Sequence, residues 1–374
     1  QDTSKIQFEI VTLLYTIKTK TLFLIGDRAQ SVYGWRGAFP QNIENFVKDY
    51  NAHTRLLTYN YRSCPEVISV ANKFQQFGKP MIPKSGTIGK VSLTEFDNQQ
   101  QEAESIAQAI MKMGDKHNET AIIYRVNTRS LLFEQTFSKY HIPYKVVNEL
   151  GFFQRKVCKD LLSVLKAANN ENDRESLKRI INNPKRGFGE AKKEQLLIRG
   201  REYVEEISAE MPEIRTFLDL LNDLKGVPPA PALEEYLNRT GYLGTIEKDS
   251  DRFMIESLRN AVVEYETVEE LILASTFLER DAKEGVNLIT AHGSKGLEFD
   301  RVFVVGVENE LWPHKNSLDV AEEERLFFVA VSRAKRYLNI SCSNSRMYRG
   351  TSIQTYPSQL FKQTYSHLYG QDIK

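Results

Sequence analysis

Short apolar runs alternate with helical patterns along most of the chain. Six of these runs are rich in Val, Ile, Leu, Tyr or Phe, and they cover residues 21–25, 120–124, 144–147, 286–290, 302–307 and 337–341. Continuous apolar runs of this length, separated by helical patterns, are typical of strands that are buried on both faces of a sheet. The pattern therefore predicts an α/β protein with a mostly parallel sheet.

The stretch 154–283 has a different pattern. It shows helical periodicity, few β-branched runs and a cluster of helix-breaking residues at 226–231. We interpret it as a mainly helical domain inserted between two parts of the α/β domain. The length of 374 residues agrees with two or three domains, since a domain usually has roughly 100–200 residues.

Composition narrows the class of protein. Hydrophobic residues make up 41% and charged residues 26%, which excludes a disordered tail, a collagen-like chain and a small disulfide scaffold. With 50 basic and 49 acidic residues the net charge is +1, so any nucleic-acid surface must be local. Cys64, Cys158 and Cys342 form no CxxC pair, which favours a reducing compartment. We see neither a membrane span nor a signal peptide, and we expect no membrane partner.

Candidate chemistry begins in the segment 26–38, directly after the first apolar run. Ligands of parallel sheets bind at the carboxyl ends of strands, so this position favours a binding loop. Gln30 both donates and accepts hydrogen bonds, which suits it to sense a phosphate oxygen. Tyr33, Trp35 and Arg36 bring two flat rings and a cation together, as stacking on single-stranded bases requires. The alternative is a loop whose rings complete the core.

Two arginines stand where they could reach a phosphoryl group. Arg62 lies in the string 60–63, just before a predicted helix start at Pro65, and its planar fork matches a phosphate. Its neighbour Tyr61 could stack on a base. Arg333 shares a helix face with the apolar positions before it, and an arginine there can stabilise charge on a transferring phosphoryl group. Taken singly, either arginine could instead sit at a helix end, exposed or paired with acidic side chains.

The segment 286–299 leads from a predicted strand into a loop of small and polar residues. Thr290, His292 and Ser294 could hold a backbone phosphate, while Glu298 faces elsewhere. Taken alone, His292 is more often a structural, hydrogen-bonded residue. The segment has neither an HExxH string nor a second nearby histidine, so we predict no metal site.

A basic stretch within the predicted helical domain could bind duplex nucleic acid. Residues 178–199 include seven basic residues, and their only acidic residues are Glu190 and Glu194. Gly187 and Gly189 precede a predicted helix, where free backbone N–H groups form a phosphate site. The alternative is a solvated basic helix.

The strings 26–38, 57–63, 286–299 and 322–335, in this order, resemble motifs III, IV, V and VI of the superfamily 1A DNA helicases of the UvrD, PcrA and Rep kind. The opening residues 1–3 resemble the end of the family's motif II. The stretches 121–144 and 183–189 also look like the family, so the resemblance covers nearly the whole chain. It is weakest between about 199 and 283.

The resemblance implies two RecA-like domains that clamp ATP between them while single-stranded DNA crosses both. Residues 1–57 would end the first RecA-like domain, and residues 58–153 and 284–374 would form the second. Residues 154–283 would be the helical domain that meets duplex DNA at a single/double-strand junction. We therefore expect an ATP-driven 3′–5′ DNA helicase, cytoplasmic, with ATP and Mg²⁺ as its ligands.

The resemblance also implies roles for single residues. On the nucleotide it places Gln30, Arg62 and Arg333 at the γ-phosphate, Tyr61 near the adenine, Glu298 at the ribose, and Gln1 and Asp2 beside them. On DNA it places Tyr33, Trp35, Arg36, Thr290, His292 and Ser294 along the single strand, and Lys185, Arg186, Gly187 and Gly189 on the duplex backbone.

One part of an ATP site is missing from the sequence. No GxxxxGK[ST] string is present, and the nearest one, at 86–91, has wrongly spaced glycines. ATP hydrolysis needs such a loop and a carboxylate that holds Mg²⁺. We therefore expect the C-terminal part of a longer helicase, with its Mg²⁺ ligands upstream and no hydrolysis by this chain alone.

Two other functions agree with parts of the sequence. The first is a DNA-binding or regulatory module that never hydrolyses ATP, which the missing loop favours. The second is the helicase subunit of a helicase–nuclease. Residues 348–374 are too few for a nuclease domain, so the second is disfavoured.

Overall fold

Five of the six predicted strands form, and they lie in one six-stranded sheet. The computed structural model describes residues 1–18, 22–114, 116–147, 152–263, 265–279, 284–317, 319–348 and 351–371. All neighbouring strands run parallel, in the order β3-β8-β7-β4-β6-β5. Their bounds are β3 Lys90–Phe96, β4 Thr120–Tyr124, β5 Tyr144–Val146, β6 Val286–Thr290, β7 Phe299–Val304 and β8 Ala334–Ser343.

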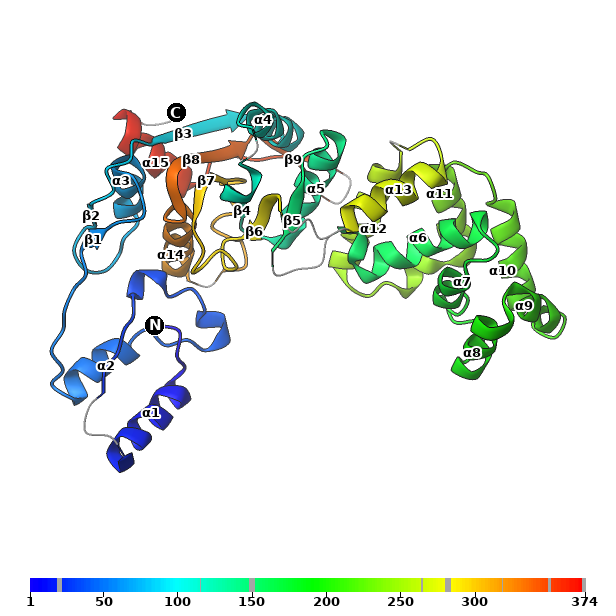
Figure 1. Cartoon of the computed structure of the whole chain (residues 1–374), viewed down its shortest axis with the longest axis horizontal. Coiled ribbons are helices and arrows are strands. Elements are labelled where there is room, and N and C mark those ends of the chain that lie inside the picture. The colour runs from blue at the N-terminus through cyan, green and yellow to red at the C-terminus, as the bar shows by residue number, and fades with distance from the viewer. Residues whose placement is uncertain are drawn as a thin grey trace. The chain divides into compact units, whose positions relative to one another are not determined.

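Alternate side chains of the strands contribute to two separate cores. From β7, Val302 and Val304 pack with α3 (Pro65–Lys73), α14 (Val320–Val331) and α15 (Gln359–Tyr369). From the same region, Phe303 and Val305 pack with α4 (Gln99–Lys112) and α5 (Ser130–Lys139). Because successive side chains of a strand point to opposite faces, helices cover both faces of the sheet (Figure 1). The predicted α/β class is confirmed.

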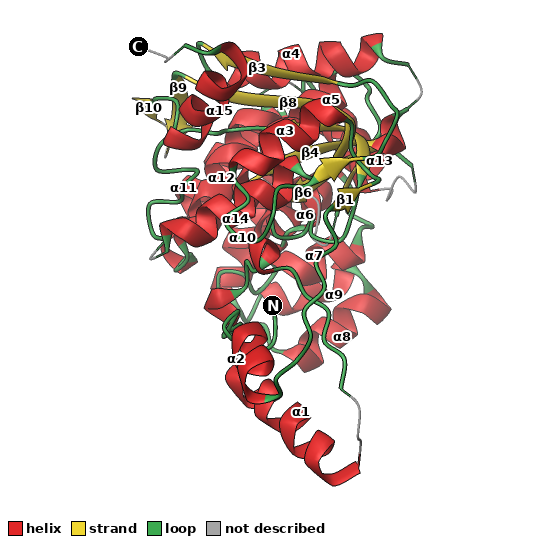
Figure 2. Cartoon of the chain, turned by 90° about the vertical axis from the view of Figure 1, so that its left-hand side faces the viewer, coloured by secondary structure: helices red, strands yellow, loops and turns green. Residues whose placement is uncertain are grey.

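The prediction of a strand at 21–25 was wrong. Thr21 lies outside the described residues, and residues 22–25 form no strand. Phe23 and Ile25 are 84% and 83% exposed, because the described strands include none beside this segment with which it could pair. Figure 2 draws no strand beside α1 (Lys5–Lys18) and α2 (Asn42–Asp49).

The β3 strand was not predicted from its sequence. Its polar residues Ser92 and Thr94 alternate with Val91 and Leu93, and most of its side chains are only half-buried. An edge strand with one polar face lacks the continuous apolar run that marked the others. Two minor sheets complete the described strands: β1 (Tyr59–Asn60) with β2 (Ile82–Pro83), and β9 (Ser345–Tyr348) with β10 (Thr351–Gln354).

The chain divides into two compact units. The first comprises Gln1–Asn148 and Lys283–Lys374 and holds the sheet, and the second is Glu149–Ala282. The second is helical, as predicted for the insertion, with α6 Lys156–Asn169, α7 Arg174–Ile180, α8 Glu190–Arg199, α9 Arg201–Ser208, α10 Pro212–Asp223, α11 Pro229–Thr240, α12 Asp249–Val262 and α13 Val268–Glu279. Its buried α6 touches α7, α10, α11, α12 and α13. Among the described helices, none has the length and apolar character that a membrane crossing requires.

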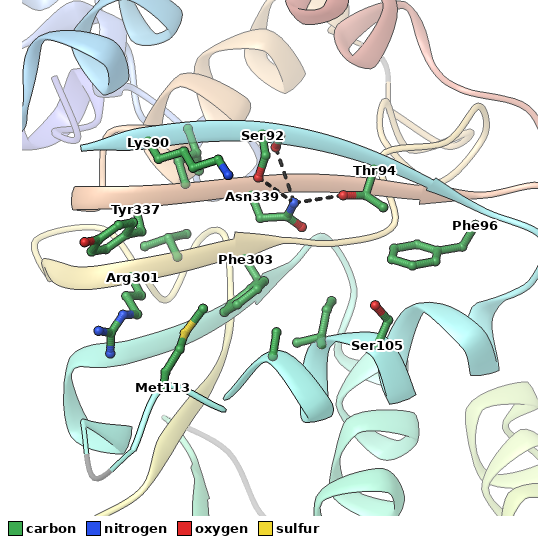
Figure 3. A pocket seen from close by; sticks show the side chains of 14 residues that line it. Lys90, Ser92, Thr94, Phe96, Ser105, Met113, Arg301, Phe303, Tyr337 and Asn339 are labelled. Carbon is green, nitrogen blue, oxygen red and sulfur yellow. Dashed lines mark hydrogen bonds between the residues drawn. The ribbon is translucent and has the colours of Figure 1, made fainter. Parts of the chain in front are cut away.

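A groove of about 260 Å³ lies where α4 covers the sheet incompletely (Figure 3). Asn339 from β8 lies on this face and donates hydrogen bonds to the Ser92 hydroxyl and the Thr94 hydroxyl, both at 3.0 Å. These bonds satisfy a polar group on an open part of the sheet. None of the predicted site residues lines this groove.

Candidate functional site

Arg333 is a buried cation directly beyond the end of α14. Its side chain is 1% exposed, and it donates to the Val329 carbonyl (2.8 Å), the Leu297 carbonyl (3.1 Å) and the Ser332 hydroxyl (2.8 Å). None of the described carboxylates forms an ion pair with it. Burial, and then the Arg62 charge, lower the pKa of Arg333 to about 10, so it remains charged at pH 7.

Arg62 lies beside Arg333 although about 270 residues separate the two segments. The Asn60 side chain accepts from the backbone N–H groups of Arg62 (2.9 Å) and Ser63 (3.0 Å), which fixes the turn before α3. The Ser63 hydroxyl then donates to the Ala334 carbonyl at 2.6 Å, so the turn is attached to the start of β8. The structure therefore brings together the two arginines that the sequence predicted for a phosphoryl group.

Glu298 stands between two cations at this place. Its Oε2 accepts from Arg62 Nε at 2.7 Å, and its Oε1 lies 2.7 Å from Lys335 Nζ. The hydrogen bond from Lys335 is the main cause that lowers the pKa of Glu298, so the carboxylate stays ionised. Lys335 was not predicted as a site residue. The run of basic residues at 333–336 is the sequence signal that could have identified it. Tyr61, next to Arg62, presents a ring that is 74% exposed.

Gln30 and Gln1 belong to the same neighbourhood as the arginines. Gln30 ends the 3-10 helix Arg28–Gln30, and its Nε2 donates to Asp27 Oδ2 at 2.7 Å. Gln1 Oε1 accepts from the Asp27 backbone N–H at 3.0 Å. Asp27 is also a charge that raises the pKa of Arg333, against the larger lowering by burial and by Arg62.

Lys295 connects the loop after β6 to the N-terminal segment. Its ammonium donates to both Asp2 oxygens (2.7 and 2.6 Å) and to the Gln30 carbonyl (2.6 Å), and it lies 5.1 Å from the centre of the Tyr33 ring. Lys295 lies within the segment 286–299, but the sequence pattern predicted no role for it. Both oxygens of the Asp2 carboxylate are bound by the lysine. The described residues also include no cluster of three His, Cys, Asp or Glu side chains that could hold a metal ion. These residues therefore do not fit a Mg²⁺ site by themselves.

An aromatic and cationic group forms around His292. The Tyr33 hydroxyl donates to the His292 carbonyl at 3.2 Å, and the Trp35 ring meets the His292 ring edge-on with centroids 6.4 Å apart. Arg36 lies 4.5 Å from the Trp35 ring centre, and Trp35 is 66% exposed. Burial, and then the charge of Arg125, lower the pKa of His292 to about 4, so the imidazole is neutral at pH 7. An open ring and a cation of this kind suit stacking on bases.

Thr290 and Ser294 use their hydroxyls inside the loop. The Thr290 hydroxyl accepts from the Gly293 N–H at 3.1 Å. Ser294 is fully buried and donates to the Ala291 carbonyl at 2.7 Å. Both residues therefore shape the loop that presents His292.

The predicted duplex-binding residues of the second unit divide into two groups. Lys185, Gly187 and Gly189 are exposed directly before α8, while Phe188 is fully buried and anchors the loop. Arg186 instead donates to three carbonyls, those of Ile180 (3.2 Å), Ile181 (3.1 Å) and Pro184 (3.2 Å). It also lies 4.1 Å from the ring centre of Phe217. Arg186 therefore stabilises the loop that Lys185 and the glycines present.

Comparison with known proteins identifies two matching family models. The model for the UvrD-like helicase C-terminal domain matches residues 56–226 and 243–345. The model for the UvrD/REP helicase N-terminal domain matches residues 1–51.

Individual relatives agree with the family models. The ATP-dependent DNA helicase PcrA of Staphylococcus epidermidis is 34% identical over 413 residues, which cover 97% of this chain and 56% of that protein. PcrA of Staphylococcus aureus is 33% identical over the same shares. The chain thus spans about half the length of these relatives. A solved structure, the C-terminal domain of a possible DNA helicase from Lactobacillus, aligns over 82% of this chain and 94% of that chain at 11% identity and a TM-score of 0.33, too low to bear on the fold.

Proposed function

Since the chain belongs to the UvrD-like helicase family, we propose that it is the C-terminal part of an ATP-dependent 3′–5′ DNA helicase. Its six-stranded unit is RecA-like, as in the family. In this proposal residues 1–57 end a first RecA-like domain, residues 58–153 and 284–374 form the second, and residues 154–283 form the helical domain. The buried free cysteines agree with a reducing, cytoplasmic setting.

The observation that carries the proposal is the pair of arginines. A buried guanidinium is costly unless an anion compensates it, and Arg333 has no carboxylate partner among the described residues. Arg62 adds a second cation from another segment, attached to the same strand end. The γ-phosphate of ATP supplies the missing anion, and the two arginines stabilise the charge that develops during phosphoryl transfer.

Other residues of the first unit complete this half of the site. Tyr61 provides a ring for the adenine, and Gln30, held by Asp27, faces the γ-phosphate. The phosphate cradle and the Mg²⁺ ligands are supplied from outside this sequence, because the described residues do not fit them. When ATP binds, Arg62 exchanges one contact to Glu298 for a phosphate oxygen.

DNA lies on the aromatic group in this proposal. Trp35 and Tyr33 stack on bases of the single strand, and Arg36 adds a cation beside them. Lys295 contacts both the Gln30 carbonyl and the Tyr33 ring. A shift of Gln30 at the nucleotide is therefore passed through this one lysine to Tyr33 at the DNA. Lys185 and the N–H groups of Gly187 and Gly189 hold the duplex backbone.

ATP hydrolysis stimulated by single-stranded DNA tests the proposal. The 374-residue chain and the complete protein that contains it are assayed side by side. We expect hydrolysis by the complete protein and none by the chain alone. Hydrolysis by the chain alone would require a phosphate cradle within these residues. DNA binding without hydrolysis by the complete protein would instead support the second candidate, a DNA-binding module, which the missing GxxxxGK[ST] string favours.

A further inference from the structure

The Glu298 carboxylate is shared by two cations that come from different segments. Arg62 precedes α3, and Lys335 belongs to β8. Each binds a different oxygen of Glu298, at 2.7 Å in both cases. All three side chains are partly open to solvent, with exposures of 33% for Arg62, 43% for Glu298 and 40% for Lys335. Ion pairs that are this open to solvent are weak, so Arg62 and Lys335 can exchange Glu298 for another partner.

The backbone keeps Lys335 close to Arg62 whatever their side chains do. The Lys335 carbonyl accepts from the Cys64 N–H at 2.8 Å, two residues after Arg62. The Ser63 hydroxyl donates to the carbonyl of Ala334, the residue before Lys335. The lysine is therefore attached to the same turn as the arginine, and it remains next to Glu298 if Arg62 leaves.

We propose that Lys335 is a positioning residue that releases Arg62 from Glu298 for the γ-phosphate. Glu298 and a phosphate compete for the same guanidinium. Lys335 neutralises the Glu298 carboxylate, which lowers the cost of breaking the Arg62–Glu298 pair. Without Lys335, Glu298 has Arg62 as its remaining partner and holds it more firmly away from the nucleotide. The inference rests on the proposed ATP site and adds a residue to it.

The neighbouring arginines, Arg333 and Arg336, do not pair with Glu298 in place of Lys335. Arg336 is bound to Asp300 through two contacts, one of them 2.6 Å long. Arg333 is buried and has its own carbonyl partners. Among the described residues, Lys335 is thus the cation other than Arg62 that pairs with Glu298.

The experiment measures KM for ATP and kcat of the complete protein with saturating single-stranded DNA. We expect Lys335→Gln to raise KM by about three- to ten-fold, the size of one charge-assisted contact, with little change in kcat. Lys335→Arg should restore the wild-type KM. In the Glu298→Gln background, Lys335→Gln should have no further effect, because no carboxylate competes for Arg62.

Each outcome decides between named alternatives. An equal KM increase in both backgrounds means that Lys335 attracts the nucleotide directly, and an unchanged KM means that it has no role; either result overturns the inference while the proposed function stands. A wild-type protein without DNA-stimulated hydrolysis overturns both. Arg239→Gln, at an exposed arginine of the second unit that pairs with Asp223, is the matched control and should leave KM unchanged.

Discussion

Arg333 carries a full charge into the interior, and its three partners explain how the fold tolerates it. Two carbonyls and a hydroxyl accept from its guanidinium, so each of its three nitrogens has a partner while its charge has no counter-ion among the described carboxylates. A residue in this state is held rigidly and still favours an anion. This combination is what stabilisation of a transferring phosphoryl group requires.

Replacing Arg333 should therefore remove hydrolysis more than binding. In the complete protein, we expect Arg333→Ala to lower kcat by about 10²- to 10³-fold, the usual effect of losing one charge-stabilising donor. A lysine at this position could not form the same fork of hydrogen bonds, so Arg333→Lys should recover little. Steady-state ATPase assays with single-stranded DNA measure both. Retention of wild-type kcat by Arg333→Ala would exclude the arginine from the reaction.

His292 gives a prediction about pH. Its folded-state pKa of about 4 lies below the unfolded value of about 6.5, so the unfolded state binds more protons between these values. The stability that the neutral imidazole provides is therefore complete above pH 6.5 and is lost as the pH falls toward 4. The free energy of unfolding should fall when the pH is lowered from about 7.5 to about 5. We expect this fall to be about 1–2 kcal/mol smaller in His292→Asn than in the wild type.

Thermal or urea unfolding at the two pH values measures this difference. His53→Asn is the control, because His53 is exposed in a loop. His314, whose pKa burial also lowers, contributes with the same sign and is present in both variants. An equal loss in wild type and His292→Asn would contradict the assignment.

At the scale of elements, the site depends on how closely three segments approach one another. Gly89 precedes β3, and a Cβ there would lie 2.2 Å from the Cys64 sulfur and 2.2 Å from the Arg336 carbonyl. Cys64 is the N-cap of α3, two residues after Arg62, and Arg336 lies on β8, directly after Lys335. The absence of a side chain at 89 therefore allows the contact on which the candidate site rests.

Gly89→Ala should disturb this contact. We expect it to destabilise the protein by about 1–3 kcal/mol, as overpacking at a tight contact does. Gly86→Ala is the matched control, because a Cβ at Gly86 meets nothing within 4 Å. Equilibrium unfolding in urea compares them. Equal stabilities of the two variants would show that the backbone at 89 moves aside freely.

At the scale of the whole molecule, the chain keeps two kinds of surface on two separate units. The first unit holds the arginines and the aromatic group, and the second holds the loop of Lys185, Gly187 and Gly189. With a net charge of +1, attraction to DNA depends on such local groups and not on the whole protein.

Lys185 should contribute one phosphate contact. We expect Lys185→Ala to weaken duplex binding and to reduce the slope of log K against log salt by about 1. Lys225→Ala, at an exposed lysine of the same unit that pairs with Glu171, should leave the slope unchanged. Titrations at several salt concentrations measure both. Identical slopes for the two variants would remove the loop from the duplex interface.

The sequence by itself determined the α/β class, the helical insertion and the family. These depend on local features: apolar runs that form β4, β5, β6, β7 and β8, and four motif strings in a fixed order. It failed at 21–25, because an apolar run becomes a strand only beside a partner. It missed β3 because an edge strand lacks a continuous apolar run.

The tertiary structure decided which charges meet and which are buried. The sequence predicted Arg333, Arg186 and Lys185 alike as cations for phosphates. In the structure Arg333 is buried, Arg186 is half-buried and donates to three carbonyls, and Lys185 is exposed. The pairing of Glu298 with Arg62 and Lys335 joins segments more than 230 residues apart. Burial and pairing are properties of distant segments brought together, so no local pattern could state them.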